Sequence, residues 1–363
     1  MIAGLRSGDK PASETQRSPT RLEERLPSVV AVVLNWNNLA DTLEAIQSLR
    51  RSDYENLAVW VVDNDSREDP THQLELEHPG IRVLRNATNL GYGGGNNTGL
   101  KRAIAEGADY VLLLNNDAVV APDTVQRLVS ALERDPRIAM ATPTVFYYDR
   151  PTEVYWDGGF VDWKTGDTPH DSRRLSTHDG IVSSEWLDGC ALLVRTVAAR
   201  EIGLLDERYF LYFEDAEWSV RARRRGWTNV VVRAGQVWHK VSRSTGGTAN
   251  PAVRFYYLRN RYLFMKTHHP VQAGIMWRIR YLSRIWREYV VLRHELAGRQ
   301  AVIAAFVSLL RDRWGPYDLA GSGGRTVRVL DGLLKPVRKC LDLIKRTREW
   351  FQRVKAPASG KSD

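Results

Sequence analysis

The order of apolar runs along the chain constrains the fold more than any other feature of the sequence. From Ser28 onward, short runs rich in Val, Ile and Leu alternate with stretches in which apolar residues recur every three or four positions. The short runs predict strands and the longer stretches predict helices. This order is typical of an α/β fold with a mixed, mainly parallel sheet that is covered by helices on both faces. The predicted strands are residues 29–34, 57–62, 81–84 and 110–114, with helices at 39–49 and 96–106.

The second half of the chain has a different character. Residues 142–189 are rich in Trp, Asp, Gly and Thr, so we expect loops and antiparallel strands that complete the sheet. A helix is predicted at 214–225 and a last strand at 230–232, and aromatic, arginine-rich helices follow from Pro251. These changes predict four parts: a disordered N-terminal tail at 1–27, an α/β domain at 28–250, a helical region at 251–320 and a basic amphipathic tail at 321–363.

Net charge is unevenly distributed along the sequence. The 363 residues include 52 Lys and Arg against 43 Asp and Glu, which gives a net charge of +9. Residues 251–363 contain 23 and 8 of these, so this part has a charge of +15, whereas residues 1–250, with 29 and 35, have −6. A basic C-terminal region favours anionic partners such as membrane phosphates over a general affinity for nucleic acid.

Cysteine usage and apolar runs bear on the compartment. Cys190 and Cys340 are far apart in sequence, which argues against a disulfide framework or a cysteine-based zinc site. The first 27 residues contain no apolar stretch of the signal-peptide type. The longest apolar run, 301–310, is shorter than the roughly 20 residues that span a bilayer. We therefore expect a cytoplasmic protein that is soluble or peripheral on the inner face of the cell membrane.

A short polar motif follows the predicted strand at 110–114. Asn115, Asn116 and Asp117 place a carboxylate at the carboxyl edge of the sheet, where open α/β sheets bind ligands. A divalent cation held there against a diphosphate is one interpretation. A simple turn is the other, because Asn and Asp are common at strand ends.

A glycine-rich segment follows the third predicted strand. Residues 91–99 read GYGGGNNTG, which predicts a loop that leads into a helix and offers backbone N–H groups to a ligand. Only part of a dinucleotide-binding fingerprint is present, because Asn96 stands where a third glycine is expected and the segment does not follow the first strand. A purely structural loop is equally compatible with the pattern.

Two further groups have side chains suited to catalysis or metal binding. Glu214 and Asp215 begin the predicted helix at 214–225, and a carboxylate there can act as a general base toward a hydroxyl. Acidic residues at a helix start also complement the helix dipole, which is the commoner explanation. His239 follows the last predicted strand and is either a metal ligand or a structural histidine.

The order of these motifs resembles that of family 2 glycosyltransferases, and most closely that of rhamnosyltransferase-type members. The resemblance extends from about Ser28 to Ser244. It implies a GT-A fold, an activated nucleotide-sugar donor and inversion at the anomeric carbon. The motifs that support it are Asn35-Trp36-Asn37, Asp63-Asn64-Asp65-Ser66, residues 89–99, Asn115-Asn116-Asp117, Asp188-Gly189, Glu214-Asp215 and His239.

The resemblance also implies roles for single residues. Asp215 matches the catalytic base of the family, with Glu214 as the reserve candidate. Residues 115–117 stand in place of an Asp-x-Asp motif whose first acid is Asn here, which leaves Asp117 and His239 as ligands of Mg²⁺ or Mn²⁺. The residues expected to contact the donor nucleotide are Asn35, Asn37, Asp63, Asn64, Asn96 and Asn116.

The resemblance favours dTDP-rhamnose as the donor, with UDP- and GDP-sugars as alternatives, and a glycan or lipid-linked glycan of the cell surface as the acceptor. Aromatic and basic residues at 256–262 either contact the acceptor or pack a helix onto the catalytic domain. Apolar stripes at 275–296 and 330–344 are interpreted either as amphipathic helices on an anionic membrane or as dimer contacts.

Two other functions fit parts of the sequence. A nucleotide-sugar or carbohydrate-binding protein of the same fold without turnover is the alternative, although the presence of Asp117, Asp215 and His239 argues against it. Nucleic-acid binding would depend on the positive charge alone, because no nucleic-acid-binding module is recognisable. We therefore expect no nucleic-acid partner.

Overall fold

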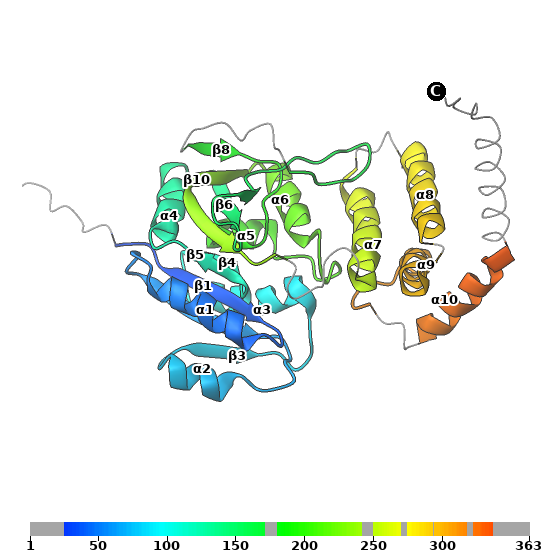
Figure 1. Cartoon of the computed structure of the whole chain (residues 1–363). Coiled ribbons are helices and arrows are strands. Elements are labelled where there is room, and N and C mark those ends of the chain that lie inside the picture. The colour runs from blue at the N-terminus through cyan, green and yellow to red at the C-terminus, as the bar shows by residue number, and fades with distance from the viewer. Residues whose placement is uncertain are drawn as a thin grey trace, which may run out of the picture.

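The computed structural model describes residues 25–170, 180–241, 250–269, 274–292, 294–317 and 322–336. In these residues ten strands form one mixed sheet in the order β3-β2-β1-β4-β9-β6-β10-β5, with β7 beside β6 and β8 beside β10 (Figure 1). The strands are β1 Val29–Asn35, β2 Leu57–Asp63, β3 Arg82–Arg85, β4 Tyr110–Asn115, β5 Ala118–Val120, β6 Ile138–Tyr147, β7 Val154–Trp156, β8 Ile181–Ser183, β9 Ala191–Arg195 and β10 Thr228–His239.

The N-terminal half confirms the predicted α/β order. β1 pairs in parallel with both β2 and β4, and β2 pairs in parallel with β3. Every residue from Val29 to Val33 is buried, which requires that both faces of β1 are covered. The helices of the sheet domain are α1 Leu39–Arg50, α2 Thr71–Glu77, α3 Gly91–Ala105, α4 Thr124–Arg134, α5 Thr196–Ile202 and α6 Glu214–Arg224.

The glycine-rich segment is helical, so the prediction of a loop at 91–95 is wrong. Helix α3 begins at Gly91, five residues before the predicted start. The glycines allow close packing, because a Cβ at Gly99 would lie 2.5 Å from the side chain of Val32 in β1. Gly91 has a φ of +73°, and a Cβ there would collide with the Phe210 carbonyl. Glycine at these positions therefore brings α3 against the sheet and against the segment that precedes α6.

The last strand is much longer than the predicted 230–232. β10 pairs in parallel with β6 over most of its length and in antiparallel with β5 at its end. In that second pairing His239 lies opposite Ala118, the residue after Asp117. The register therefore brings together two motifs that are more than one hundred residues apart in sequence.

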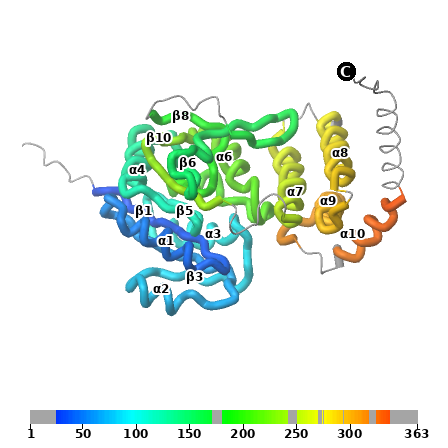
Figure 2. Tube along the Cα trace, viewed as in Figure 1, coloured from blue at the N-terminus to red at the C-terminus, as the bar shows by residue number. Residues whose placement is uncertain are grey.

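Helices α7 Pro251–His268, α8 Gly274–Val291, α9 Leu296–Leu310 and α10 Ser322–Leu333 lie together beside the sheet domain (Figures 1 and 2). α7 faces the sheet domain, and Tyr256 stacks on Phe210 with ring centroids 5.5 Å apart. α8 packs on α7 through Trp277 and Tyr281, which both contact the Tyr262 ring.

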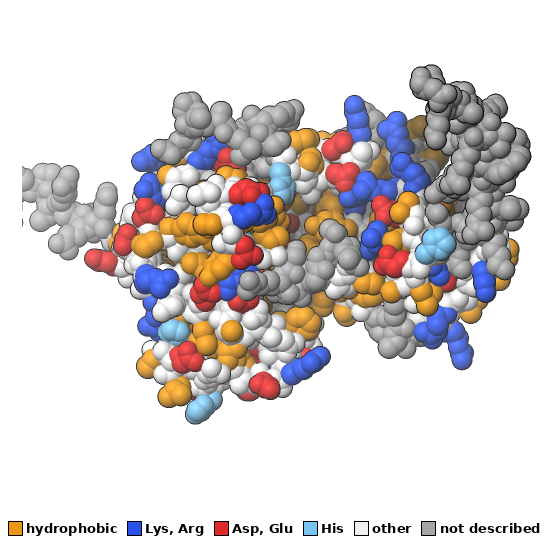
Figure 3. Space-filling view, in the orientation of Figure 1, with side chains coloured by type: hydrophobic (Ala, Val, Ile, Leu, Met, Phe, Trp, Pro, Cys, Tyr) orange, Lys and Arg blue, Asp and Glu red, His pale blue; other side chains and the backbone are white. Residues whose placement is uncertain are grey.

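The C-terminal helices have a basic surface. Figure 3 shows Lys and Arg side chains gathered over the part of the molecule formed by α7 and α8. No helix in the described ranges is both long and apolar enough to cross a bilayer. The predicted apolar stripe at 330–344 lies outside the described residues beyond Pro336.

Candidate active site

A cavity of about 1080 Å³ lies between the carboxyl edge of the sheet, the start of α6 and helix α7. Its lining comes from segments spread over most of the described chain, from β1 to the residues after α9. Six of the ten site residues predicted from the sequence line this cavity: Asn64, Asn116, Asp117, Glu214, Asp215 and His239.

Asp117 and His239 meet at one wall of the cavity. The Nε2 atom of His239 lies 3.1 Å from Oδ1 of Asp117, and both side chains are largely buried. The backbone N–H of Lys240 donates to the carbonyl oxygen of Asp117 at 3.0 Å, which fixes the β5 and β10 ends together. A carboxylate oxygen and an imidazole nitrogen side by side are donors that suit Mn²⁺ and, through the oxygen, Mg²⁺. These two residues are therefore the candidates for holding a cation.

Asn35 and Asp63 lie behind the cavity wall and do not line it. Asn35 Nδ2 donates to Asp63 Oδ1 at 2.8 Å, and both residues are buried. Thr42 Oγ1 donates to Asn35 Oδ1 at 2.8 Å and accepts from Asn116 Nδ2 at 3.2 Å. The network therefore orients Asn116, which does line the cavity. Direct nucleotide contacts by Asn35 and Asp63 stay predictions.

Asn37 and Asn96 are also outside the cavity lining. Asn37 has a φ of +56° and is exposed in the turn after β1. Asn96 is buried inside α3, where its Nδ2 donates to the Tyr92 carbonyl oxygen at 3.1 Å. Asn64, in contrast, lines the cavity, and its Nδ2 donates to the Gly91 carbonyl oxygen at 3.0 Å. Asn64 thus ties the end of β2 to the start of α3.

The first turn of α6 places two carboxylates on the cavity, the buried Glu214 and the half-buried Asp215. The Ala216 and Gly189 backbone N–H groups donate to the two oxygens of Asp215 at 2.7 and 3.1 Å. Burial, and then the nearby Asp188 carboxylate, raise the pKa of Asp215. Burial, and then the Asp215 charge, raise the pKa of Glu214 as well. A carboxylate with a raised pKa is a better proton acceptor near neutral pH than an ordinary one.

The segment before α6 has a strained backbone. Phe210, Tyr212 and Phe213 have φ values of +64°, +68° and +75°, a region that L-residues with large side chains rarely adopt. Such conformations persist only where the surroundings fix them. From the α3 side, the Tyr92 backbone N–H donates to the Phe210 carbonyl oxygen at 2.6 Å.

Helix α7 holds the same segment from the other side. Asn260 Nδ2 lies within hydrogen-bonding distance of three carbonyl oxygens, those of Tyr209, Leu211 and Tyr212, at 2.9, 2.7 and 2.8 Å. Arg259 Nη2 donates to the Tyr209 carbonyl oxygen at 2.7 Å. Asn260 and Arg259 are 0% and 1% exposed, so water does not replace these contacts. The position of the α6 carboxylates therefore depends on α7.

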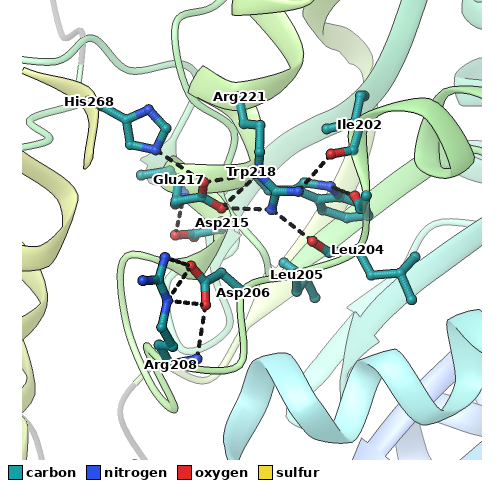
Figure 4. Close-up of polar contacts among 12 residues, drawn as sticks. Ile202, Leu204, Leu205, Asp206, Arg208, Asp215, Glu217, Trp218, Arg221 and His268 are labelled. Atoms are coloured by element: carbon teal, nitrogen blue, oxygen red, sulfur yellow. Dashed lines mark hydrogen bonds and ion pairs between the residues drawn. The ribbon is translucent and has the colours of Figure 1, made fainter. Parts of the chain in front are cut away.

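A further network fixes α6 itself (Figure 4). Glu217 pairs with Arg221 at 2.7 Å, and His268 Nε2 of α7 lies 3.0 Å from its other oxygen. Arg221 also donates to the carbonyl oxygens of Ile202 and Leu204 at 2.8 and 2.7 Å. Burial alone would raise the pKa of Glu217, but the hydrogen bonds from His268 and Arg221 lower it overall. Glu217 is therefore a structural carboxylate, unlike Asp215.

Comparison with known proteins identifies the family. Residues 110–316, more than half of the chain, match the model of glycosyl transferase family group 2, and residues 28–185 match that of glycosyl transferase family 2. The chain belongs to the family 2 glycosyltransferases. It is similar to N-acetylglucosaminyl-diphospho-decaprenol L-rhamnosyltransferase of Mycobacterium tuberculosis, with 27% identity over 270 residues that cover 66% of this chain and 85% of the relative.

Other glycosyltransferases show similar levels of likeness. Galactofuranosyltransferase GlfT1 of Mycobacterium tuberculosis is 30% identical over 212 residues, which cover 55% of this chain and 66% of the relative. The dTDP-rhamnosyl transferase RfbF of Shigella flexneri is 20% identical over 261 residues, which cover 67% of this chain and 81% of the relative.

Solved glycosyltransferase structures confirm the predicted GT-A fold. GalNAc-T7 with UDP, GalNAc and Mn²⁺ superposes with a TM-score of 0.53 at 16% identity, over 71% of this chain and 55% of that one. TarS of Staphylococcus aureus superposes with a TM-score of 0.51 at 16% identity, over 78% of this chain and 49% of that one. This chain thus spans about half the length of each solved chain.

Several further residues line the cavity of this glycosyltransferase. Acceptor contact and helix packing were both expected for the stretch that contains Tyr257, whereas Trp36, Asp188 and Gly189 had no individual role assigned from the sequence. Tyr257 is 40% exposed and stacks on Tyr212 with ring centroids 4.6 Å apart. Trp36 is 46% exposed at the end of β1. Asp188 and Gly189 precede β9. The Gly189 backbone N–H donates to Asp215, and the Asp188 charge raises the pKa of Asp215. The sequence signals for them were an aromatic residue inside the first motif and the Asp-Gly pair inside the motif order.

Proposed function

We propose that this glycosyltransferase is inverting and metal-dependent and transfers L-rhamnose from dTDP-rhamnose to a hydroxyl of a lipid-linked glycan in cell-surface polysaccharide synthesis. The observation that carries the proposal is that two carboxylates of raised pKa, Glu214 and Asp215, share one cavity with the Asp117–His239 pair. The names of two relatives, both rhamnosyltransferases, support the choice of sugar. UDP- and GDP-sugars are the alternative donors, and a glycan without lipid is the alternative acceptor.

In the proposed reaction Asp215 is the general base. Its carboxylate accepts the proton of the acceptor hydroxyl while that oxygen bonds to the anomeric carbon. The bond from this carbon to the diphosphate oxygen breaks, and its electron pair leaves with the diphosphate. The hydrogen bonds from Gly189 and Ala216 fix both carboxylate oxygens, which orients the base toward the acceptor. Attack opposite the leaving group inverts the anomeric centre.

Asp117 and His239 are the residues that would hold Mg²⁺ or Mn²⁺. They fit a cation because both are largely buried, line the cavity and present oxygen and nitrogen donors. In the described residues no group of three or more His, Cys, Asp and Glu is placed to hold a metal, so the protein would supply two such ligands. A bound cation would offset the charge that develops on the leaving diphosphate.

The donor nucleotide is assigned to the sheet-edge asparagines. We place Asn64 and Asn116 in direct contact with it, because both line the cavity. Asn35 and Asp63 act on the nucleotide through Thr42 and Asn116, as their buried hydrogen bonds indicate. Asn37 is exposed, so a contact with the donor is open to it, whereas a contact by the buried Asn96 would require a change in its surroundings on donor binding.

A panel of donors tests the function directly. The full chain is incubated with Mg²⁺ or Mn²⁺, a synthetic N-acetylglucosaminyl-diphosphoryl lipid and one of dTDP-rhamnose, UDP-galactose or GDP-mannose. We expect acceptor-dependent release of dTDP and a product heavier by one deoxyhexose, with hydrolysis measured separately in reactions without acceptor. Transfer from UDP-galactose or GDP-mannose instead of dTDP-rhamnose would change the assigned donor. Tight binding of nucleotide sugars without turnover would replace the enzyme by a binding protein.

Helix α8 supports a peripheral membrane location, with an anionic bilayer as the proposed partner. One face of α8 is apolar and 40–57% exposed, and exposed arginines occur on the same helix. Apolar side chains flanked by cations are the pattern of a helix that lies on anionic lipid, and the charge of +15 on residues 251–363 adds to the attraction. The apolar face consists of Met276, Ile279, Leu282 and Trp286, and the arginines are Arg278, Arg280 and Arg287.

Vesicle sedimentation tests this location. Substitution of Ile279 and Leu282 by Glu should weaken binding of the full chain to phosphatidylglycerol vesicles by about tenfold or more. Leu76→Glu, at a leucine of α2 that is 72% exposed, is the control and should bind as the unmodified chain does. Absence of vesicle binding, together with a dimer in light scattering that the double variant dissociates, would assign the face to a second copy instead.

A further inference from the structure

Two arginines share one carboxylate at the α7 side of the cavity. Arg284 Nη1 of α8 lies 3.1 Å from one oxygen of Asp167, and Arg261 Nη2 of α7 pairs with the other. Both Asp167 and Arg261 line the cavity. Since one carboxylate balances one of the two guanidinium charges, this corner of the cavity has an excess of positive charge.

Arg261 is incompletely satisfied by its surroundings. The residue is 7% exposed, and its Nε and Nη1 atoms have no hydrogen-bond partner in the part of the chain that the structure describes. Burial, and then the neighbouring Arg284 charge, lower the pKa of Arg261, while the Asp167 carboxylate acts in the opposite direction. Buried guanidinium donors without acceptors are costly unless an anionic ligand completes them.

This corner of the cavity is connected through α7 to the carboxylates at the start of α6. Arg261 follows Tyr257 by one turn of α7, a rise of about 6 Å along the helix. Tyr257 in turn contacts Phe213, the residue before Glu214. Arg284 belongs to α8, the helix whose exposed apolar face was assigned to the bilayer. Arg261 on α7 therefore lies between the α6 carboxylates and α8, and Arg284 faces it from α8 across Asp167.

We propose that Arg261 and Arg284 form a second anion-binding site, which takes the diphosphate of a lipid-linked acceptor. The diphosphate of the donor is assigned to the opposite wall, where Asp117 and His239 would hold a cation against it. A diphosphate at Arg261 leaves the acceptor sugar beside Tyr257 and Asp215, and its lipid chain follows the apolar face of α8. The assignment of the anion to the acceptor rests on the proposed function. The existence of a second diphosphate site does not depend on that function.

The experiment uses farnesyl diphosphate as the probe and farnesol as its uncharged counterpart, with binding to the full chain measured by calorimetry. The unmodified protein should bind farnesyl diphosphate at least about tenfold more tightly than farnesol, and saturating dTDP with Mg²⁺ should not displace it. Arg284→Gln, which keeps the Arg261–Asp167 pair, should weaken this binding about tenfold or more and leave the affinity for dTDP unchanged. Arg261→Lys should weaken it as well while keeping a positive charge beside Asp167.

Arg254→Gln is the matched control. Arg254 and Arg284 are both outside the cavity lining, but Arg254 pairs with a carboxylate of α8, Glu288, at 2.8 Å, whereas Arg284 pairs with Asp167, which lines the cavity. This variant should bind farnesyl diphosphate as the unmodified chain does. Equal losses in Arg254→Gln and Arg284→Gln, or displacement of the probe by dTDP, would overturn the second site. A donor panel without turnover, combined with the expected probe binding, would overturn the proposed enzyme and leave the site standing.

Discussion

Two walls of the same cavity are built in different ways. At the sheet edge, Asp117 and His239 are fixed by backbone pairing between β5 and β10, and the side chains are free to vary without loss of that pairing. At the opposite wall, Asp215 follows a strained segment that is held by side chains, above all by Asn260 of α7. The comparison teaches that the sheet alone holds the first wall in position. The position of the second wall depends on both the sheet domain and the C-terminal helices.

The sharpest test of the second wall is Asp215→Asn. We expect transfer to fall by about 10³-fold or more, because the amide cannot accept the proton of the acceptor hydroxyl. The fold and dTDP affinity should be retained, as measured by thermal unfolding and calorimetry. Asp206→Asn is the control, since Asp206 pairs with Arg208 outside the cavity lining, and its activity should stay within about twofold. Near-normal turnover of Asp215→Asn would remove this residue from the mechanism.

The sheet-edge wall is tested by Asp117→Asn together with chelation. The substitution should lower transfer by about 10²-fold or more and weaken the dependence on Mg²⁺ or Mn²⁺, because one cation ligand is lost. EDTA should stop the unmodified enzyme, and added Mn²⁺ or Mg²⁺ should restore it. Thermal unfolding should change little, since backbone pairing keeps this wall in place. Full activity of the unmodified enzyme in EDTA would contradict the metal role of Asp117 and His239.

The claim that α7 builds the second wall is tested by Asn260→Ala. Loss of hydrogen bonds to three carbonyl oxygens should lower the free energy of unfolding by about 2–4 kcal/mol and lower kcat by about 10- to 100-fold. The KM for the donor should stay nearly unchanged, because the sheet edge is not altered.

Asn229→Ala is the control for loss of a buried amide, since Asn229 is 0% exposed and donates to the Ser219 carbonyl oxygen at 2.8 Å. It should destabilise the fold by about 1 kcal/mol and keep its kcat. A parallel loss of kcat in both variants would mean that instability, and not the position of Asp215, explains the effect.

The smallest expected effect is on the pH dependence of stability. The folded-state pKa of Glu214 is raised by burial and by Asp215, so between about pH 4 and that raised value the folded protein binds more protons than the unfolded chain. Stability therefore falls as pH rises through this window. Glu214→Gln should unfold at a higher temperature than the unmodified chain at pH 8 and lose this advantage at pH 4. Identical pH profiles of the two proteins would contradict the assignment.

The sequence was sufficient to predict the sheet-edge wall but not the second one. The apolar run before Asn115 placed Asp117 at the carboxyl edge of the sheet. The last strand was predicted to end at residue 232, so His239 was joined to Asp117 through the family resemblance and not through the strand pattern. The partners of Asp215 could not be read in this way, because Gly189 and Asn260 reach it through long-range packing without a local pattern. The prediction of a loop at 91–95 was wrong for the same reason. Gly91 and Gly99 allow close contacts with Phe210 and β1 and do not form a loop.

The hydrogen bonds from Asn260 to the backbone of residues 209–212 have a consequence for chimeric enzymes. An exchange of C-terminal regions between family members at residue 250 would separate α7 from the segment that it supports. The hybrid would keep a complete nucleotide-binding sheet yet misplace its base, so its failure would be mistaken for a wrong acceptor. Recombination that transfers residues 209–213 and α7 as one inherited unit avoids this error. We expect natural exchange of acceptor specificity in this family to respect the same boundary.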